Sequence, residues 1–157
     1  MYNLDSVNMD TVKQSVEALL SEGKSVEFSP SGTSMYPLFV TPKDKAVVVP
    51  YGNDIKLKRG DVCVYRRKDG PLVIHRIVRV NGDSVWFCGD HHTEIEGPLP
   101  ITCIKGKMTE FVRKGKRFSV NNSGYRFLAG LWLFIRPLRP FCIRFGHYGK
   151  VIIGKAK

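Results

Sequence analysis

A serine in a bent segment of the chain, Ser34, could act as a nucleophile. Residues 29–37 read SPSGTSMYP. Because proline and glycine flank Ser34, the chain must bend there and hold the serine hydroxyl out of a regular strand. Small residues before it leave backbone amides free, as an oxyanion hole requires. We take Gly32, Thr33 and Met35 as candidate oxyanion-hole and substrate-binding positions, although such a motif also occurs in ordinary loops.

A general base is offered by the strand-like segment 72–80. Its alternating pattern predicts a β-strand with Val73, His75 and Ile77 on one face. An imidazole suits the task because its unperturbed pKa of about 6.5 leaves it neutral, and able to accept a serine proton, near pH 7. A single histidine in a strand is more commonly structural than catalytic, so the role of His75 has to be argued from the residues around it.

A hairpin following this strand supplies a candidate partner for the base. Asn81-Gly82 is a strong two-residue turn signal, and counting back from it pairs His75 with Cys88. Asp90 then falls diagonally opposite, on the same face as His75, where its carboxylate would orient the imidazole. A three-residue turn would reverse the faces. The alternative interpretation is that Asp90 is only a turn residue.

Four motifs in order now suggest a family. They are Ser34-Met35-Tyr36-Pro37, Gly60-Asp61-Val62, His75-Arg76-Ile77 and Gly89-Asp90. In this order, over residues 28–112, the chain resembles the clan of serine peptidases that includes the signal peptidases and the LexA-type proteins. With histidine as the base, it is similar to the endoplasmic-reticulum and archaeal-type branch.

The resemblance implies both a fold and a set of roles. The implied fold is mainly β, a coiled antiparallel β barrel of the LexA and signal-peptidase type. The implied roles are Ser34 as nucleophile, His75 as general base and Asp90 as the orienting carboxylate, with the Ser34 amide in the oxyanion hole and cleavage after small residues. Two departures are the lack of an apolar anchor before the serine and the presence of Gly32 where many bacterial members carry a serine.

The rest of the chain is expected to position these groups. Apolar periodicity predicts a helix over 8–22, and turn signals then separate several strands. The expected strands are 25–28, 46–49, 61–66, 72–80, 84–88, 101–104 and 107–112. We divide the chain into an N-terminal helix (1–24), a catalytic β domain (25–120) and a basic, aromatic C-terminal extension (121–157), with a short helix over 124–136 that Pro137 ends.

Charge is distributed unevenly, and the excess lies in the C-terminal extension. Residues 1–104 hold 12 Lys/Arg and 13 Asp/Glu, whereas residues 105–157 hold 13 Lys/Arg and only Glu110. Exposed apolar side chains with arginines beside them would bind an anionic membrane surface without crossing it. The residues concerned are Phe127, Leu128, Leu131, Trp132, Phe134 and Ile135, with Arg126, Arg136, Arg139 and Arg144. Ordinary packing of this helix on the domain is the alternative, and nucleic acid is the least favoured partner.

Cofactors and compartment are only weakly indicated. The four cysteines lack a CxxC pair, so we expect buried free thiols rather than a zinc site or a disulfide framework. His91-His92 suggests a solvent-exposed turn rather than a metal site, and neither metal nor organic cofactor is implied. The chain shows no signal peptide, and its longest apolar run, nine residues, is too short to span a bilayer. We therefore expect it in the cytoplasm or peripherally on a membrane.

The sequence thus predicts a serine endopeptidase acting on a leader or signal-type peptide through an acyl-enzyme at Ser34. Two alternatives stay open. One is a catalytically inactive module on the same fold that binds a membrane or nucleic acid. The other is a self-cleaving regulator, which would need a DNA-binding unit larger than residues 1–24 provide.

Overall fold

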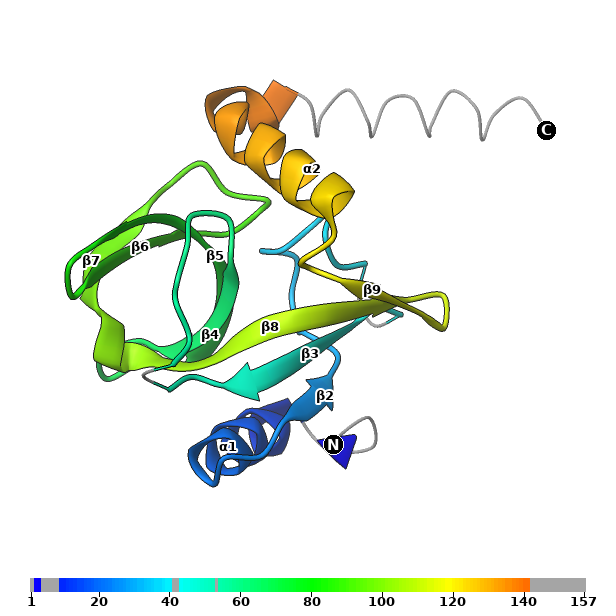
Figure 1. The fold of residues 1–157 in the computed structure, drawn as a ribbon, viewed down its shortest axis with the longest axis vertical. Coiled ribbons are helices and arrows are strands. Elements are labelled where there is room, and N and C mark those ends of the chain that lie inside the picture. The colour runs from blue at the N-terminus through cyan, green and yellow to red at the C-terminus, as the bar shows by residue number, and fades with distance from the viewer. Residues whose placement is uncertain (1, 4–8, 41–42, 53, 142–157) are drawn as a thin grey trace.

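One nine-stranded sheet forms most of the molecule (Figure 1). The computed structural model describes residues 2–3, 9–40, 43–52 and 54–141. The strands are β1 (Tyr2–Asn3), β2 (Val26–Phe28), β3 (Lys45–Pro50), β4 (Val62–Arg66), β5 (Leu72–Asn81), β6 (Ser84–Cys88), β7 (Glu96–Pro100), β8 (Ile104–Arg113) and β9 (Lys116–Ser119). The mainly β class is confirmed, and β1, β7 and β9 are additional to the predicted strands.

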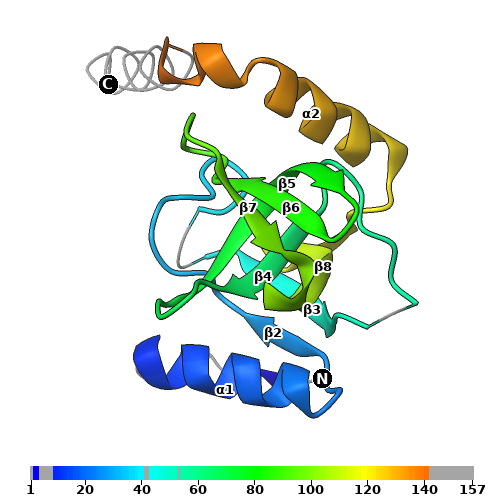
Figure 2. The ribbon, with the colours of Figure 1, turned by 90° about the vertical axis from the view of Figure 1, so that its left-hand side faces the viewer.

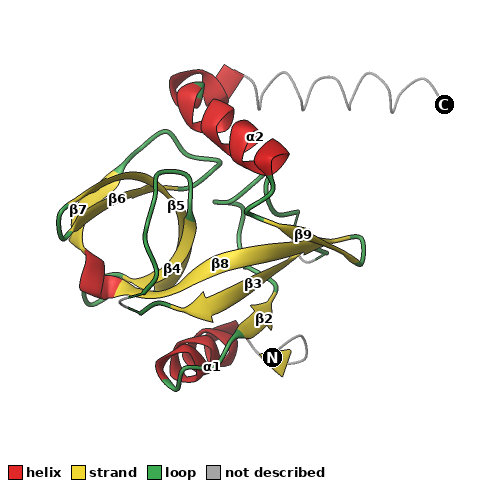
Figure 3. Cartoon of the chain, viewed as in Figure 1, coloured by secondary structure: helices red, strands yellow, loops and turns green. Residues whose placement is uncertain are grey.

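The sheet is open rather than closed into the expected barrel. Its strands follow the order β1-β2-β3-β8-β4-β5-β6-β7, with β9 paired to β8. All pairs are antiparallel except β1 with β2. Within the described residues, β1 and β7 remain the two unpaired ends of this path. Strong twist makes β4 to β7 curl around a small core without joining those ends (Figure 3).

Two helices lie at opposite ends of the sheet (Figures 1 and 2). The predicted helices are confirmed as α1 (Met9–Ser21) and α2 (Ser123–Phe134). The Asn122 side chain starts α2 by accepting hydrogen bonds from the amides of Gly124 and Tyr125. Two short 3-10 turns, η1 (Ile101–Cys103) and η2 (Arg136–Leu138), complete the elements, so the strand predicted over 101–104 is wrong.

Apolar side chains gather in two cores on the two faces of the sheet. The first core joins α1 to the sheet through Val16 and Leu20, and it also receives Met35 from the serine segment. The second core lies inside the curl of β4 to β8 and is centred on Tyr65 and Phe87, whose rings stack 4.0 Å apart. The two faces of β5 therefore meet different surroundings.

An extra residue in β5 changes the predicted hairpin register. The turn joins Asn81 to Ser84, and a register shift follows between Ile77 and Arg79. The turn residues are Gly82-Asp83 and not the predicted Asn81-Gly82, a register that by itself would place Cys88 opposite Ile77. The bulge then moves Cys88 to Arg76, so the predicted pairing with His75 is wrong. A one-residue slip exchanges the faces of all side chains beyond it. The face that Asp90 shares is therefore that of Arg76.

Two further predictions concern the state of the cysteines and the length of the helices. Cys63 and Cys88 are buried free thiols, Cys103 is a half-buried one, and Cys142 lies outside the described residues. Among the helices described, none has the length and apolar character needed to cross a membrane.

Candidate active site

The serine segment is a compact turn anchored in the first core. Gly32 adopts a φ of +78°, a left-handed conformation that glycine accepts without strain. The Tyr36 amide donates to the Thr33 carbonyl at 3.0 Å, and Met35 is buried. This arrangement leaves Ser34 half-buried at the surface of the turn. The buried side chain of Met35 packs in the first core, and its role as an oxyanion-hole or substrate-binding position stays a prediction.

Backbone donors for an oxyanion lie beside the serine. Gly32 and Thr33 are exposed, and the Ser34 amide has no hydrogen-bond acceptor among the described residues. An unpaired amide beside a serine hydroxyl is the type of group that can stabilise the oxyanion of an acyl-transfer intermediate. The predicted oxyanion-hole positions are therefore accessible, apart from the Met35 side chain.

Ser34 and His75 approach each other around Gly89. A Cβ placed on Gly89 would lie 2.7 Å from the Ser34 carbonyl oxygen and 3.4 Å from His75 Nε2. The turn after Gly89 is also bonded to the serine segment, because the His91 amide donates to the Ser34 carbonyl oxygen at 2.9 Å. Only glycine fits between the serine turn and the imidazole. The structure thus brings together two segments about forty positions apart.

His75 presents one ring nitrogen to this meeting point and binds the protein with the other. Its side chain is buried, at 5% exposure, and Nδ1 lies 3.0 Å from the Tyr65 hydroxyl. That hydroxyl donates its single hydrogen to Glu96 Oε2 at 2.7 Å, so it accepts from Nδ1–H. Nε2 therefore keeps its lone pair and is free to take a proton.

Burial keeps the imidazole neutral. Desolvation, with the nearby positive charge of Arg67, lowers the pKa of His75 to about 4, although Glu96 acts in the opposite direction. The neutral form is the one that can serve as a general base. At neutral pH His75 is therefore in this neutral form.

Asp90 does not bind His75, contrary to the sequence prediction. Both of its carboxylate oxygens accept hydrogen bonds from Arg76, at 2.8 and 2.6 Å, in a fully buried bidentate pair. Arg76 also donates to the Gly60 carbonyl and to the Tyr125 hydroxyl. The bulge in β5 causes this exchange of partners, and the pair ties the Asp90 turn to β5 and α2.

Tyr65 and Glu96 are the site residues that the sequence prediction missed. One signal was available, because Tyr65 alternates with Cys63 in the predicted strand 61–66 and Cys63 pairs with His75. Glu96 gave no such signal, since it opens a strand that was not predicted. Burial raises the pKa of Glu96, but hydrogen bonds from Arg67 and Tyr65 outweigh it, and the carboxyl stays ionised with its pKa below the ordinary value.

The turn from Cys88 to His92 is held from outside by the C-terminal segment. Arg139 is completely buried and donates to the carbonyls of Gly89 and His92 at 2.9 and 2.8 Å. Trp132 in α2 donates through Nε1 to the Asp90 carbonyl at 3.0 Å. The predicted solvent-exposed turn is therefore packed on one side, with His91 half-buried and its ring edge-on to Tyr36 at 5.9 Å.

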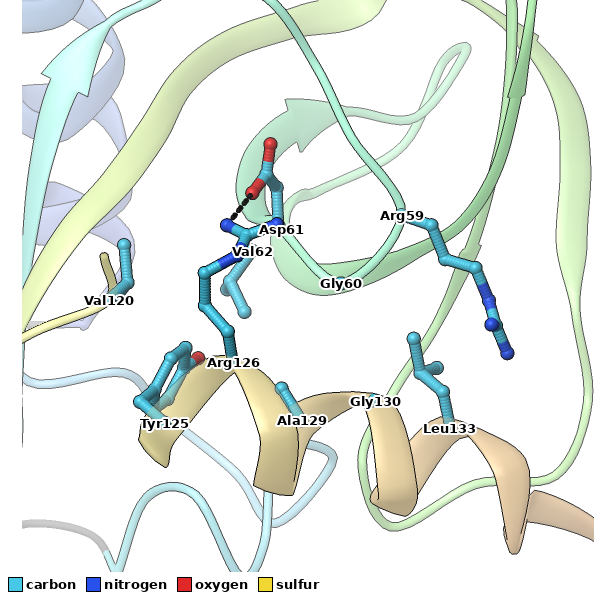
Figure 4. A pocket seen from close by; sticks show the side chains of 10 residues that line it. All are labelled: Arg59, Gly60, Asp61, Val62, Val120, Tyr125, Arg126, Ala129, Gly130 and Leu133. Carbon is cyan, nitrogen blue, oxygen red and sulfur yellow. Dashed lines mark ion pairs between the residues drawn. The ribbon is translucent and has the colours of Figure 1, made fainter. Parts of the chain in front are cut away.

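A separate cleft of about 220 Å³ opens between α2 and the Arg59–Val62 turn (Figure 4). Its wall carries Asp61, which is paired with Lys107 at 2.8 Å and with Arg126 at 3.7 Å. A carboxylate neutralised by two cations is a structural group, and neither Ser34 nor His75 lines this cleft. In the described part of the chain, no group of three or more His, Cys, Asp or Glu side chains could hold a metal ion.

The chain was compared with known protein families and with curated proteins. The chain matches no model of a known protein family. No curated protein matches it either.

Proposed function

We propose that this chain is a serine endopeptidase in which Ser34 is the nucleophile and His75 is the general base. The observation that carries the proposal is the meeting around Gly89, where the Ser34 main chain and His75 Nε2 lie within 2.7 and 3.4 Å of one point. A serine in a rigid turn, a neutral imidazole and an unpaired amide are the three groups that acyl transfer needs.

The reaction follows from the state of each group. Ser34 Oγ attacks the scissile carbonyl of an extended peptide while Nε2 takes its proton. The Ser34 amide binds the oxyanion of the tetrahedral intermediate. The protonated imidazole then gives its proton to the leaving amine, and an acyl-enzyme remains at Ser34 until His75 activates a water to hydrolyse it. A leader or signal-type peptide is the substrate that the family resemblance suggests.

A serine-directed phosphonate probe tests this assignment. Wild-type protein should be labelled at one site, and Ser34→Ala should abolish labelling because the probe bonds covalently only to an activated hydroxyl. Ser31→Ala is the matched control, since Ser31 is an exposed serine in the same turn. Labelling should be measured by intact mass, with detergent or lipid present. A folded wild-type protein that takes up no probe would support the inactive module instead.

Membrane association is a second proposed property, favoured by an apolar surface on the outer side of α2. Phe127 and Phe134 are 71% and 78% exposed, respectively, with more apolar side chains beside them. The exposed set is Phe127, Leu128, Leu131, Phe134, Leu138 and Phe141. Two of the predicted arginines are unsuited to headgroups, because Arg139 is buried and Arg126 pairs with Asp61. Arg144 lies outside the described residues.

Replacing Phe127 and Phe134 together by serine should weaken binding to anionic vesicles by at least about 10-fold, because two aromatic side chains lose their contact with lipid. Sedimentation with vesicles containing phosphatidylserine measures the effect. Val40→Ser is the control, since Val40 is an exposed apolar residue outside the C-terminal segment. Point variants are preferable to deleting residues 124–157, which would also remove Trp132 and Arg139. Unchanged binding by the double variant would exclude this surface.

A further inference from the structure

Nδ1 of His75 is connected through the Tyr65 hydroxyl to a half-buried carboxylate, Glu96, and to its arginine partner, Arg67. Tyr65 lies between His75 Nδ1 and Glu96, and Arg67 donates to both Glu96 oxygens, at 2.8 and 2.7 Å. Glu96 Oε2 is itself 3.9 Å from Nδ1. The connection joins β4, β5 and β7, so it is formed only when the curled part of the sheet has folded.

We propose that Tyr65 and Glu96 are the residues that position the base, in the role that the sequence assigned to Asp90. Arg67 opposes the effect of the Glu96 charge on the imidazole. The inference rests on His75 being the base of the proposed peptidase. It identifies an orienting group made of a phenol and a carboxylate in series, instead of a carboxylate in direct contact with the imidazole.

Hydrogen-bond accounting supports these roles. The Tyr65 hydroxyl has one hydrogen, which Glu96 accepts, so its oxygen lone pair faces Nδ1 and fixes the tautomer of His75. When Nε2 takes the serine proton, the imidazolium keeps Nδ1–H directed at this oxygen, and the ionised Glu96 stabilises the new positive charge. Burial and Glu96 both raise the pKa of Tyr65, so the phenol keeps its proton throughout.

The base strength of His75 is set by charges of opposite sign in this group. Glu96 raises the pKa of the imidazole and Arg67 lowers it. The remaining groups that act on His75 are His92, in the turn after β6, and Asp90, whose oxygens are occupied by Arg76. Removing one charge of the Arg67–Glu96 pair should therefore shift the pKa of His75, downward if Glu96 is neutralised and upward if Arg67 is.

Two charge-removing variants provide the decisive test. Glu96→Gln should move the acid limb of the kcat/KM profile to lower pH, and Arg67→Met should move it to higher pH. Titration of the His75 ring by NMR in the folded protein should show the same two directions without requiring any activity. The matched controls are Glu17→Gln and Arg66→Met, because Arg66 pairs with Glu17 at 3.0 Å from the opposite face of β4. Neither control should move either measurement.

A third variant tests the phenol itself. Tyr65→Phe should lower kcat roughly 10-fold or more with little change in KM, because the tautomer of His75 is no longer fixed. The ring ¹⁵N shifts should then report a mixture of tautomers. If Glu96→Gln and Arg67→Met leave the His75 titration unchanged, or shift it in the same direction, the network is overturned. If the titration shifts as expected but Ser34→Ala keeps full activity, the network stands and the proposed peptidase mechanism fails.

Discussion

Replacing His75 by glutamine should abolish turnover and at the same time make the protein more resistant to acid. Activity should fall on the order of 10⁴-fold or more, because the variant lacks the proposed general base and the members of such a site act together. Initial rates with a peptide substrate, together with phosphonate labelling, measure the loss. Retained turnover would mean that another residue acts as the base.

The acid resistance follows from the same buried imidazole. Folded His75 has a pKa of about 4, whereas in the unfolded chain its pKa is the ordinary 6.5. Between these two values the unfolded state binds more protons, so the free energy of unfolding decreases as the pH falls through this window. The loss amounts to about 3 kcal/mol, and it is complete below the lower value.

Urea unfolding at pH 7 and pH 4.5 measures this second effect. His75→Gln should show a smaller drop in unfolding free energy between the two conditions than the wild type does. Ser34→Ala is the matched control, because it removes activity but leaves the imidazole in place, and its drop should equal that of the wild type. An unchanged drop in His75→Gln would place the acid sensitivity on other groups.

Replacing Arg139 by methionine should loosen the turn from Cys88 to His92 and lower both the free energy of unfolding and the proposed activity. The substitution removes the guanidinium donor that the Gly89 and His92 carbonyls share. The Gly89 carbonyl still accepts from the His92 amide, but the His92 carbonyl keeps only the Cys88 thiol, a weak donor. A buried acceptor left poorly satisfied costs about 1–3 kcal/mol, so the free energy of unfolding should fall by about 2 kcal/mol. A displacement of this turn by about 1 Å should reduce kcat/KM about 100-fold.

The matched control for Arg139 is Arg126→Met on α2. Arg126 is partly exposed and pairs with Asp61, which keeps Lys107 as a partner, so this change should cost little. Rates should be compared at a temperature where circular dichroism shows all three proteins folded. Wild-type kcat/KM in a folded Arg139→Met variant would show that the turn keeps its geometry without the arginine.

Local patterning predicted much of the sheet but not the partner of His75. The segments that became β5 and β6 were predicted from alternation and from a turn signal, and both lie within one or two residues of the expected bounds. The bulge between Ile77 and Arg79 has no comparable signal in a run of β-branched residues and arginine. One extra residue was enough to direct Asp90 to Arg76.

The remaining parts of the site depend on contacts between distant segments. Glu96 reaches Tyr65 from a strand whose glycine and two prolines are poor indicators of β-structure. Arg139 was assigned to a membrane surface because charged side chains are seldom completely buried. Its carbonyl partners lie in a turn 47 to 50 residues earlier, a distance that no local pattern covers.

The buried arginine also has a consequence for when the proposed activity is acquired during synthesis. Ser34, His75, Tyr65 and Glu96 are all translated well before residue 139. A ribosome-bound nascent chain would thus contain every reacting group while still lacking the guanidinium that fixes the catalytic turn. The proposed activity would be acquired only when residue 139 has been translated and has docked on this turn, after most of the preceding polypeptide has folded.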